Sequence, residues 1–178
     1  MSHASGLIDK LALQAHPEGG WYREIYRSPT RVETAGGSRS AITTIYYLLE
    51  RHQLSRWHVV QADELWHFYA GAPLQLLEYD PTTRRLMRHV LGHVDTAPAA
   101  SAGGAAGAAI AAAPAASATP VAVIPARVWQ AACSLGEYSL VGCTVGPGFE
   151  FADFQFTSDL PSHADHFKGD LAPFAGLL

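Results

Sequence analysis

The spacing of apolar residues along the chain changes near residue 20. Leu7, Ile8 and Leu11 share one face of a predicted N-terminal helix. We expect Ser5 to cap this helix, and the run HPEGG at 16–20 ends it, because proline and paired glycines break helices. Further along, short runs rich in aromatic and β-branched residues alternate with Gly, Pro, Asp and Ser. These runs predict an all-β sandwich or barrel, and they are 21–27, 41–49, 54–60, 64–70, 73–79, 84–91, 121–124, 127–133, 138–145 and 150–157.

Length and local composition suggest how the chain is organised. Its 178 residues favour a single domain over 1–178. The segment 95–120 is rich in Ala, Gly and Pro, and we expect a loop insertion of low complexity between two strands, with a short alanine helix as the alternative. Residues 161–178 lack apolar periodicity, so we expect them to form a loosely packed C-terminal tail.

Charge and cysteine content limit the classes of partner and of covalent chemistry. The formal net charge is −4 without a cluster of Lys and Arg, so neither nucleic acid nor an anionic membrane is expected as a partner. No transmembrane or secretory segment stands out, and we expect a cytoplasmic protein. With a turn at 135–136, Cys133 and Cys143 would lie on paired strands but far apart along the ladder. Both are therefore expected to be reduced core residues.

The densest group of chemistry-bearing residues lies at 57–71. His58 is expected on one strand, and Glu64, Trp66 and Phe68 on one face of the next strand. His67 then faces the opposite side. A carboxylate and an imidazole on adjacent strands inside a barrel can bind a first-row metal or act as an acid/base pair. His58 and Glu64 are therefore the candidate catalytic residues.

The same stretch resembles the first motif of the cupin superfamily. Glu64 and Gly71 fit the spacing of that motif, and His58 stands at the position of one of its two histidines. Arg56 occupies the position of the other histidine, which is a departure from the motif.

A second segment, 125–130, resembles the second cupin motif, but Gln130 stands where that motif has its metal-binding histidine. Two of the four usual metal ligands are therefore absent. The resemblance implies that any divalent first-row metal would use His58 and Glu64, with His67 a less favoured ligand. The expectation we favour is that the protein has no metal cofactor.

Longer phrases resemble the cupin family 5 proteins, formerly catalogued as a domain of unknown function. They are HPEGGWYRE (16–24), TIYYLL (44–49), SRWH (55–58), DELWHFYAG (63–71), WQAA (129–132) and GCTVGPGFEF (142–151). This resemblance implies a cupin double-stranded β-helix, which is a jelly-roll barrel. It also implies a homodimer and a small-molecule pocket inside the barrel, but no particular substrate.

Further residues are expected to complete this pocket. The amide of Gln130 could orient a substrate or a water molecule. The expected apolar walls, each with core packing as its alternative, are Tyr22, Tyr46, Trp66, Phe68 and Trp129. Glu150 on the last predicted strand is an additional ligand-binding candidate. The run 16–20 is interpreted as a turn with indirect contact to the pocket, and the alternative is a ligand-binding loop whose glycines let the backbone approach a bound group.

Two functions are compatible with these residues. The first is an enzyme, of the isomerase or epimerase kind or another, that acts on a small polar, carbohydrate-like metabolite. His58 would serve as base or ligand and Glu64 as acid, ligand or orienting group. The alternative is a non-catalytic protein that binds or senses a small metabolite, which requires only shape and a few hydrogen bonds.

Overall fold

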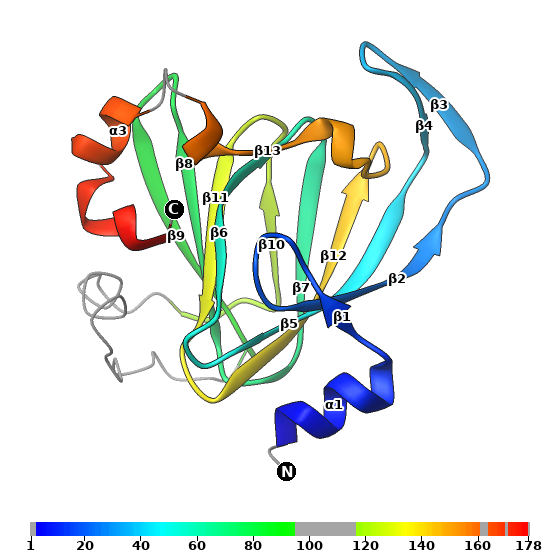
Figure 1. The fold of residues 1–178 in the computed structure, drawn as a ribbon, viewed down its shortest axis with the longest axis vertical. Coiled ribbons are helices and arrows are strands. Elements are labelled where there is room, and N and C mark those ends of the chain that lie inside the picture. The colour runs from blue at the N-terminus through cyan, green and yellow to red at the C-terminus, as the bar shows by residue number, and fades with distance from the viewer. Residues whose placement is uncertain (1–2, 95–116, 161–163, 170, 178) are drawn as a thin grey trace.

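Two antiparallel sheets pack face to face and form the body of the protein (Figure 1). The computed structural model describes residues 3–94, 117–160, 164–169 and 171–177. The six-stranded sheet has the order β1 (Gln14–Ala15), β2 (Trp21–Arg27), β5 (Thr43–Glu50), β12 (Tyr138–Gly146), β7 (Asp63–Gly71) and β10 (Val121–Ile124). The five-stranded sheet has the order β13 (Phe154–Phe156), β6 (Leu54–Val60), β11 (Trp129–Ser134), β8 (Leu74–Asp80) and β9 (Arg85–Leu91). This architecture confirms the predicted all-β class.

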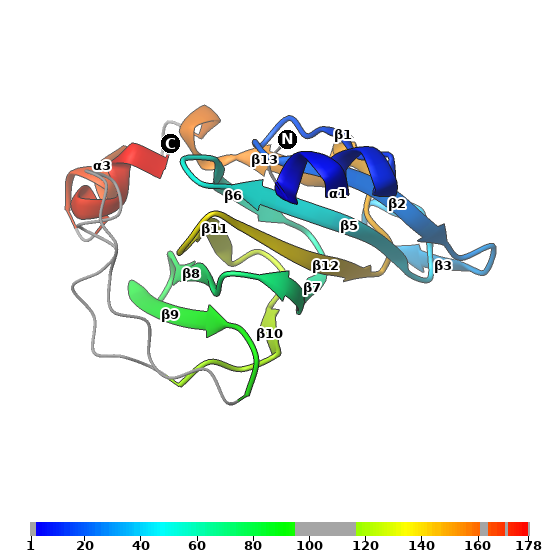
Figure 2. The same cartoon turned by 90° about the horizontal axis from the view of Figure 1, so that it is seen from below.

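The helix α1 (His3–Leu11) lies against the outer face of the six-stranded sheet (Figure 2). Leu7, Ile8 and Leu11 pack there against strand residues, as their spacing predicts. Because the helix begins at His3, Ser5 lies inside its first turn, and the prediction that Ser5 caps the helix is wrong.

Two predictions about the irregular parts of the chain need correction. A hairpin of β3 (Arg31–Thr34) and β4 (Gly37–Ser40), not predicted from the sequence, projects from one end of the molecule (Figure 1). The predicted strand 150–157 is a short helix, η1 (Phe151–Asp153), followed by β13 and the helical turn η2 (Thr157–Asp159). The bidentate contact of Arg39 on β4 with Asp153, at 2.6 and 2.9 Å, joins the hairpin to η1.

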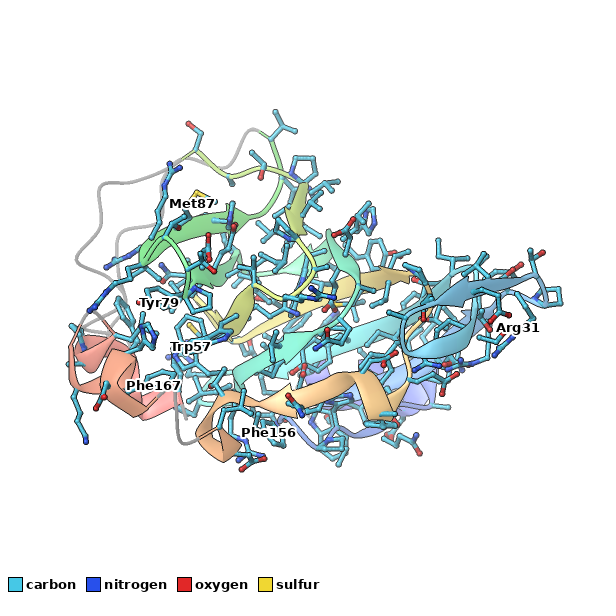
Figure 3. The ribbon with its side chains drawn as sticks, turned by 90° about the horizontal axis from the view of Figure 1, so that it is seen from above. Arg31, Trp57, Tyr79, Met87, Phe156 and Phe167 are labelled. Carbon is cyan, nitrogen blue, oxygen red and sulfur yellow. The ribbon has the colours of Figure 1, made fainter. Side chains whose placement is uncertain are left out.

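The C-terminal segment is packed rather than loose. It forms α3 (Ala164–Lys168) and η4 (Ala172–Leu177) over the outer face of the five-stranded sheet. Figure 3 shows Phe167 close to Trp57 and Tyr79, and the buried cluster also includes Leu171 and Phe174. The prediction of a loosely packed tail is wrong for the described residues, because this face of the sheet is itself apolar and is covered by the segment.

Both cysteines are buried and unpaired, which confirms that they are reduced core residues. The predicted hairpin between them is wrong. Cys133 lies on β11 of one sheet and Cys143 on β12 of the other, so the chain crosses between the sheets at 135–137.

Two further sequence-based expectations concern segments outside the strands. None of the described helices is long and apolar enough to cross a membrane. The Ala-rich segment predicted as an insertion lies outside the described residues except for 117–120, and the predicted alanine helix falls outside them too.

Candidate functional site

A cavity of about 150 Å³ opens between the ends of the two sheets. Strands β1, β2, β5, β7 and β12 line it from one sheet, and β6 and β13 line it from the other. His16, Glu18, His58 and Glu64 form its buried end. These four residues come from the turn at 16–18 and from the consecutive strands β6 and β7, which belong to different sheets.

His58 on β6 lies at this buried end with 2% of its surface exposed. Its Nδ1 is 2.7 Å from the carbonyl oxygen of Arg56. Since a carbonyl only accepts, Nδ1 carries the proton and the neutral ring leaves Nε2 as an acceptor. Burial lowers the pKa of His58, with a smaller opposing effect from the charge of Glu64. The ring of Phe154 stacks on the imidazole at 5.1 Å between centroids.

Glu18 reaches the same end of the cavity from the turn between β1 and β2. One of its oxygens, Oε2, lies 3.4 Å from Nε2 of His58, and Oε1 accepts from the hydroxyl of Ser55 at 3.1 Å. Burial raises the pKa of Glu18. The turn requires glycine next to it, because Gly19 has a φ of +114° and a Cβ there would be 2.0 Å from the carbonyl oxygen of Leu54. The run 16–20 is thus a turn, as predicted, but its contact with the cavity is direct.

Glu64 on β7 is held by an amide from the opposite sheet. Nε2 of Gln130 donates to Oε2 of Glu64 at 2.6 Å, and Oε1 of Gln130 accepts from the indole N–H of Trp66 at 3.0 Å. Because an indole nitrogen can only donate, Trp66 fixes which end of the amide faces Glu64. Burial raises the pKa of Glu64. Gln130 therefore positions a carboxyl group. The sequence predicted that it would line the cavity, and it does not.

His16 adds a second buried imidazole. Its Nδ1 accepts from the backbone N–H of Glu18 at 3.3 Å, so the neutral ring carries its proton on Nε2. Burial lowers the pKa of His16. Within the part of the chain that the structure describes, the Nε2 of His16 has no hydrogen-bond partner, although the side chain is only 7% exposed.

The mouth of the cavity carries an ion-pair group at the surface. Arg27 donates to Glu24 at 2.8 and 3.1 Å and to Glu150 at 2.8 Å. Three phenylalanines, Phe149, Phe151 and Phe154, line the same region. Glu150 was selected from the sequence and lines the cavity; Arg27, Glu24 and the phenylalanines were not selected.

Of the five aromatic residues predicted as walls, all of them described, Tyr22 alone lines this cavity. Tyr46 lies on the outer face of its sheet, 6.0 Å from the ring of Tyr69. Trp66 is in the core between the sheets, and Phe68 packs against the ring of His93. Trp129 stacks on Phe167 beneath the C-terminal segment. His67 also does not line the cavity, in agreement with its predicted orientation.

The cupin ligand positions do not fit a metal here. The guanidinium of Arg56 donates to the carbonyl of Pro17 at 3.0 Å and lies over the ring of Phe156. Both ends of the Gln130 amide are already in hydrogen bonds. Among the described residues, no group of three or more His, Cys, Asp and Glu side chains is arranged to hold a metal ion. Of the four cupin ligand positions, only those of His58 and Glu64 hold side chains that could bind a metal. Two ligands are fewer than the three protein ligands typical of catalytic zinc sites.

Comparison with solved structures supports the fold at two levels of similarity. A hypothetical protein from Leishmania major is 28% identical, with a TM-score of 0.70 and coverage of 94% of this chain and 97% of that one. A crystal structure of a Shewanella oneidensis protein is 30% identical, with a TM-score of 0.72 and 95% of each chain covered. Oxalate decarboxylase from Bacillus subtilis is 13% identical with a TM-score of 0.54, and it is matched over 84% of this chain and 31% of its own length. That distant likeness shows the fold alone.

These structures confirm the cupin jelly-roll fold predicted from the sequence. No curated protein matches the chain. The family model described as "Cupin superfamily (DUF985)" matches residues 5–157, and the chain therefore belongs to this family.

Proposed function

We propose that this protein is an enzyme that moves a proton to or from a carbon atom of a small polar, carbohydrate-like metabolite, as isomerases and epimerases do. The observation that carries the proposal is the orientation of His58. Its Nδ1–H is fixed on a backbone carbonyl, and its Nε2 lies 3.4 Å from a carboxylate oxygen of Glu18 at the buried end of the cavity. A neutral imidazole that carries no proton on Nε2 is the state that a general base needs.

In this reaction Nε2 of His58 takes the proton from the substrate. The carbonyl of Arg56 keeps its hydrogen bond to Nδ1–H, and the nearby Glu18 stabilises the imidazolium that forms. Glu64 is held by Gln130 and is the candidate acid, because burial raises its pKa and favours the protonated form. The two groups are held by different sheets, which suits proton transfer at two sides of one bound molecule.

The experiment is hydrogen exchange in heavy water. The protein is incubated in D2O with a panel of small hydroxy-carbonyl compounds, including aldoses, ketoses and amino sugars, and loss of each C–H signal is followed by proton NMR. We expect exchange of at least one compound, and we expect His58→Gln to slow it at least about 100-fold, since general bases contribute on this scale. The matched control is His67→Gln, whose side chain does not line the cavity.

Two results would contradict the proposal. Equal exchange rates in wild type and His58→Gln would remove His58 from the reaction. A compound that binds, raises the melting temperature and never exchanges would favour the alternative function, a protein that only binds or senses a metabolite.

We also propose that two copies associate through the outer face of the six-stranded sheet. Tyr69, Val121 and Val123 are exposed apolar residues on neighbouring strands of that face, and water contact with them is unfavourable. Light scattering should give twice the mass of one 19.1 kDa chain, and Val123→Glu should shift the mass toward one chain. A single-chain mass for the wild type at micromolar concentration would refute the dimer.

A further inference from the structure

The side chains around the cavity have a strong excess of acidic groups. Four carboxyl groups line it, those of Glu18, Glu24, Glu64 and Glu150, against the single guanidinium of Arg27. That guanidinium is already bound by Glu24 and Glu150. The two histidines add no positive charge, because burial lowers the pKa of each. Burial raises the pKa of Glu18 and Glu64 and favours their neutral forms. Glu24 and Glu150 share the single cation of Arg27, which leaves one net negative charge at the mouth for an anionic ligand to meet.

The aromatic walls favour the opposite charge. Phe149, Phe151 and Phe154 surround the mouth, with 5.1 Å between the first two ring centroids and 6.1 Å between Phe149 and Phe154. Tyr22 also lines this cavity. The faces of such rings attract cations. The carboxylates of Glu24 and Glu150 line the same cavity.

His16 supplies an independent requirement. Its Nε2–H lines the cavity without a partner among the described residues, and the side chain is 93% buried. A buried donor without an acceptor is costly, so a bound molecule that offers an oxygen atom here gains a hydrogen bond that the empty cavity lacks.

We infer that the cavity takes a small organic cation that also carries a hydroxyl or carbonyl oxygen, such as an amino alcohol or an amino sugar. The cationic nitrogen binds among the phenylalanine rings and the carboxylates, and the oxygen accepts from His16. A neutral polyol could satisfy the same hydrogen bonds, but it would leave the net negative charge of the Glu24, Glu150 and Arg27 group without a counter-charge. This inference rests on the proposed function for the existence of a substrate and adds the charge of that substrate.

The test compares a cationic ligand with a neutral ligand of similar shape in each of two pairs, by titration calorimetry on the whole chain. Choline is compared with its neutral isostere 3,3-dimethylbutan-1-ol, and glucosamine with glucose. We expect the cation of at least one pair to bind at least about tenfold tighter than its neutral partner, a difference of about 1.4 kcal/mol. The pair that shows the difference identifies the ligand as an amino alcohol or an amino sugar.

Two variants test the residues that carry the inference. Phe151 is 54% exposed, so Phe151→Leu removes a π face with little effect on folding. Phe151→Leu and Glu150→Gln should each weaken binding of the cation several-fold and leave binding of the neutral partner unchanged. The control is Glu137→Gln, which removes an exposed carboxyl group away from the cavity and should change the binding of neither ligand.

Equal or tighter binding of the neutral member in both pairs would overturn the inference, as would the failure of both cations to bind. Different results decide the proposed function. His58-dependent exchange of a neutral sugar would uphold proton transfer while the cation inference fails, and absence of exchange with selective cation binding would do the reverse.

Discussion

Replacing Gln130 by leucine tests the hydrogen bonds that hold Glu64 in place. The amide is 1% exposed, and leucine is similar in volume, so the change removes two hydrogen bonds and leaves no large cavity. The indole N–H of Trp66 loses its acceptor, at a cost of about 1–3 kcal/mol for a buried unsatisfied group. Glu64 loses a donor, which adds a loss of about 1.5–3 kcal/mol if it stays ionised, and less if it becomes protonated. We expect Gln130→Leu to lower the free energy of unfolding by about 2–5 kcal/mol.

The assay is urea unfolding at neutral pH, with two companion variants. Gln61→Leu replaces an exposed amide and should change stability by less than about 0.5 kcal/mol. In a Trp66→Phe background the donor is gone, so Gln130→Leu should cost about 1 kcal/mol less than in the wild type. A loss below about 0.5 kcal/mol for Gln130→Leu in the wild type would show that the amide does not support Glu64.

Two further predictions concern the pH dependence of stability and the C-terminal segment. Burial raises the pKa of Glu64 in the folded chain above its usual 4.5, so its contribution to stability is fully present below pH 4.5 and is lost as the pH rises through the folded pKa. The stability of wild type relative to Glu64→Gln should therefore fall as pH rises from 4.5 toward neutral, and a flat or rising difference in urea unfolding would contradict this sign. Leu171 lies between α3 and η4 and is fully buried in the cluster against the sheet, so Leu171→Ala should cost about 2–5 kcal/mol. An unchanged unfolding midpoint would mean that the segment is loose after all.

The strands with clear apolar patterns were predictable because short runs of aromatic and β-branched residues are bounded by turn residues. The sequence-based bounds 21–27, 54–60 and 121–124 agree with β2, β6 and β10. The hairpin at 31–40 was not predictable in this way, because its residues are mostly polar and it gains stability from a tertiary contact, the pair of Arg39 and Asp153. The C-terminal helices are too short to show periodicity, so their burial depends on the apolar sheet face they cover.

Part of the site could be predicted from strand alternation and the cupin motifs. His58 and Glu64 were found in this way, and the structure places both at the buried end of the cavity. Glu18 and His16 were missed because they lie in a turn, where no period assigns a side chain to the interior. The available signal was the pair of glycines that follows Glu18. At Gly19 the backbone lies so close to Leu54 of β6 that the neighbouring residues His16 and Glu18 lie at the barrel interior.

The role of Gln130 could not be read from its position in a motif. Its place matched a ligand position, but its function depends on Trp66, whose N–H turns the amide nitrogen toward Glu64. Similarly, the aromatic residues selected as walls were assigned without knowing which face of each strand meets the cavity. Ile45 lines it, and the adjacent Tyr46 consequently points outward.

The central claim is that His58 is a neutral base with its proton on Nδ1. Nitrogen-15 NMR of the histidine side chains at pH 7, with His58→Gln used to assign the signals, measures this directly. The structure predicts a neutral ring with Nδ1 protonated, Nε2 unprotonated and a pKa below the usual 6.5. An imidazolium at pH 7, or a neutral ring with its proton on Nε2, would contradict the claim and remove the basis for proton abstraction by this residue.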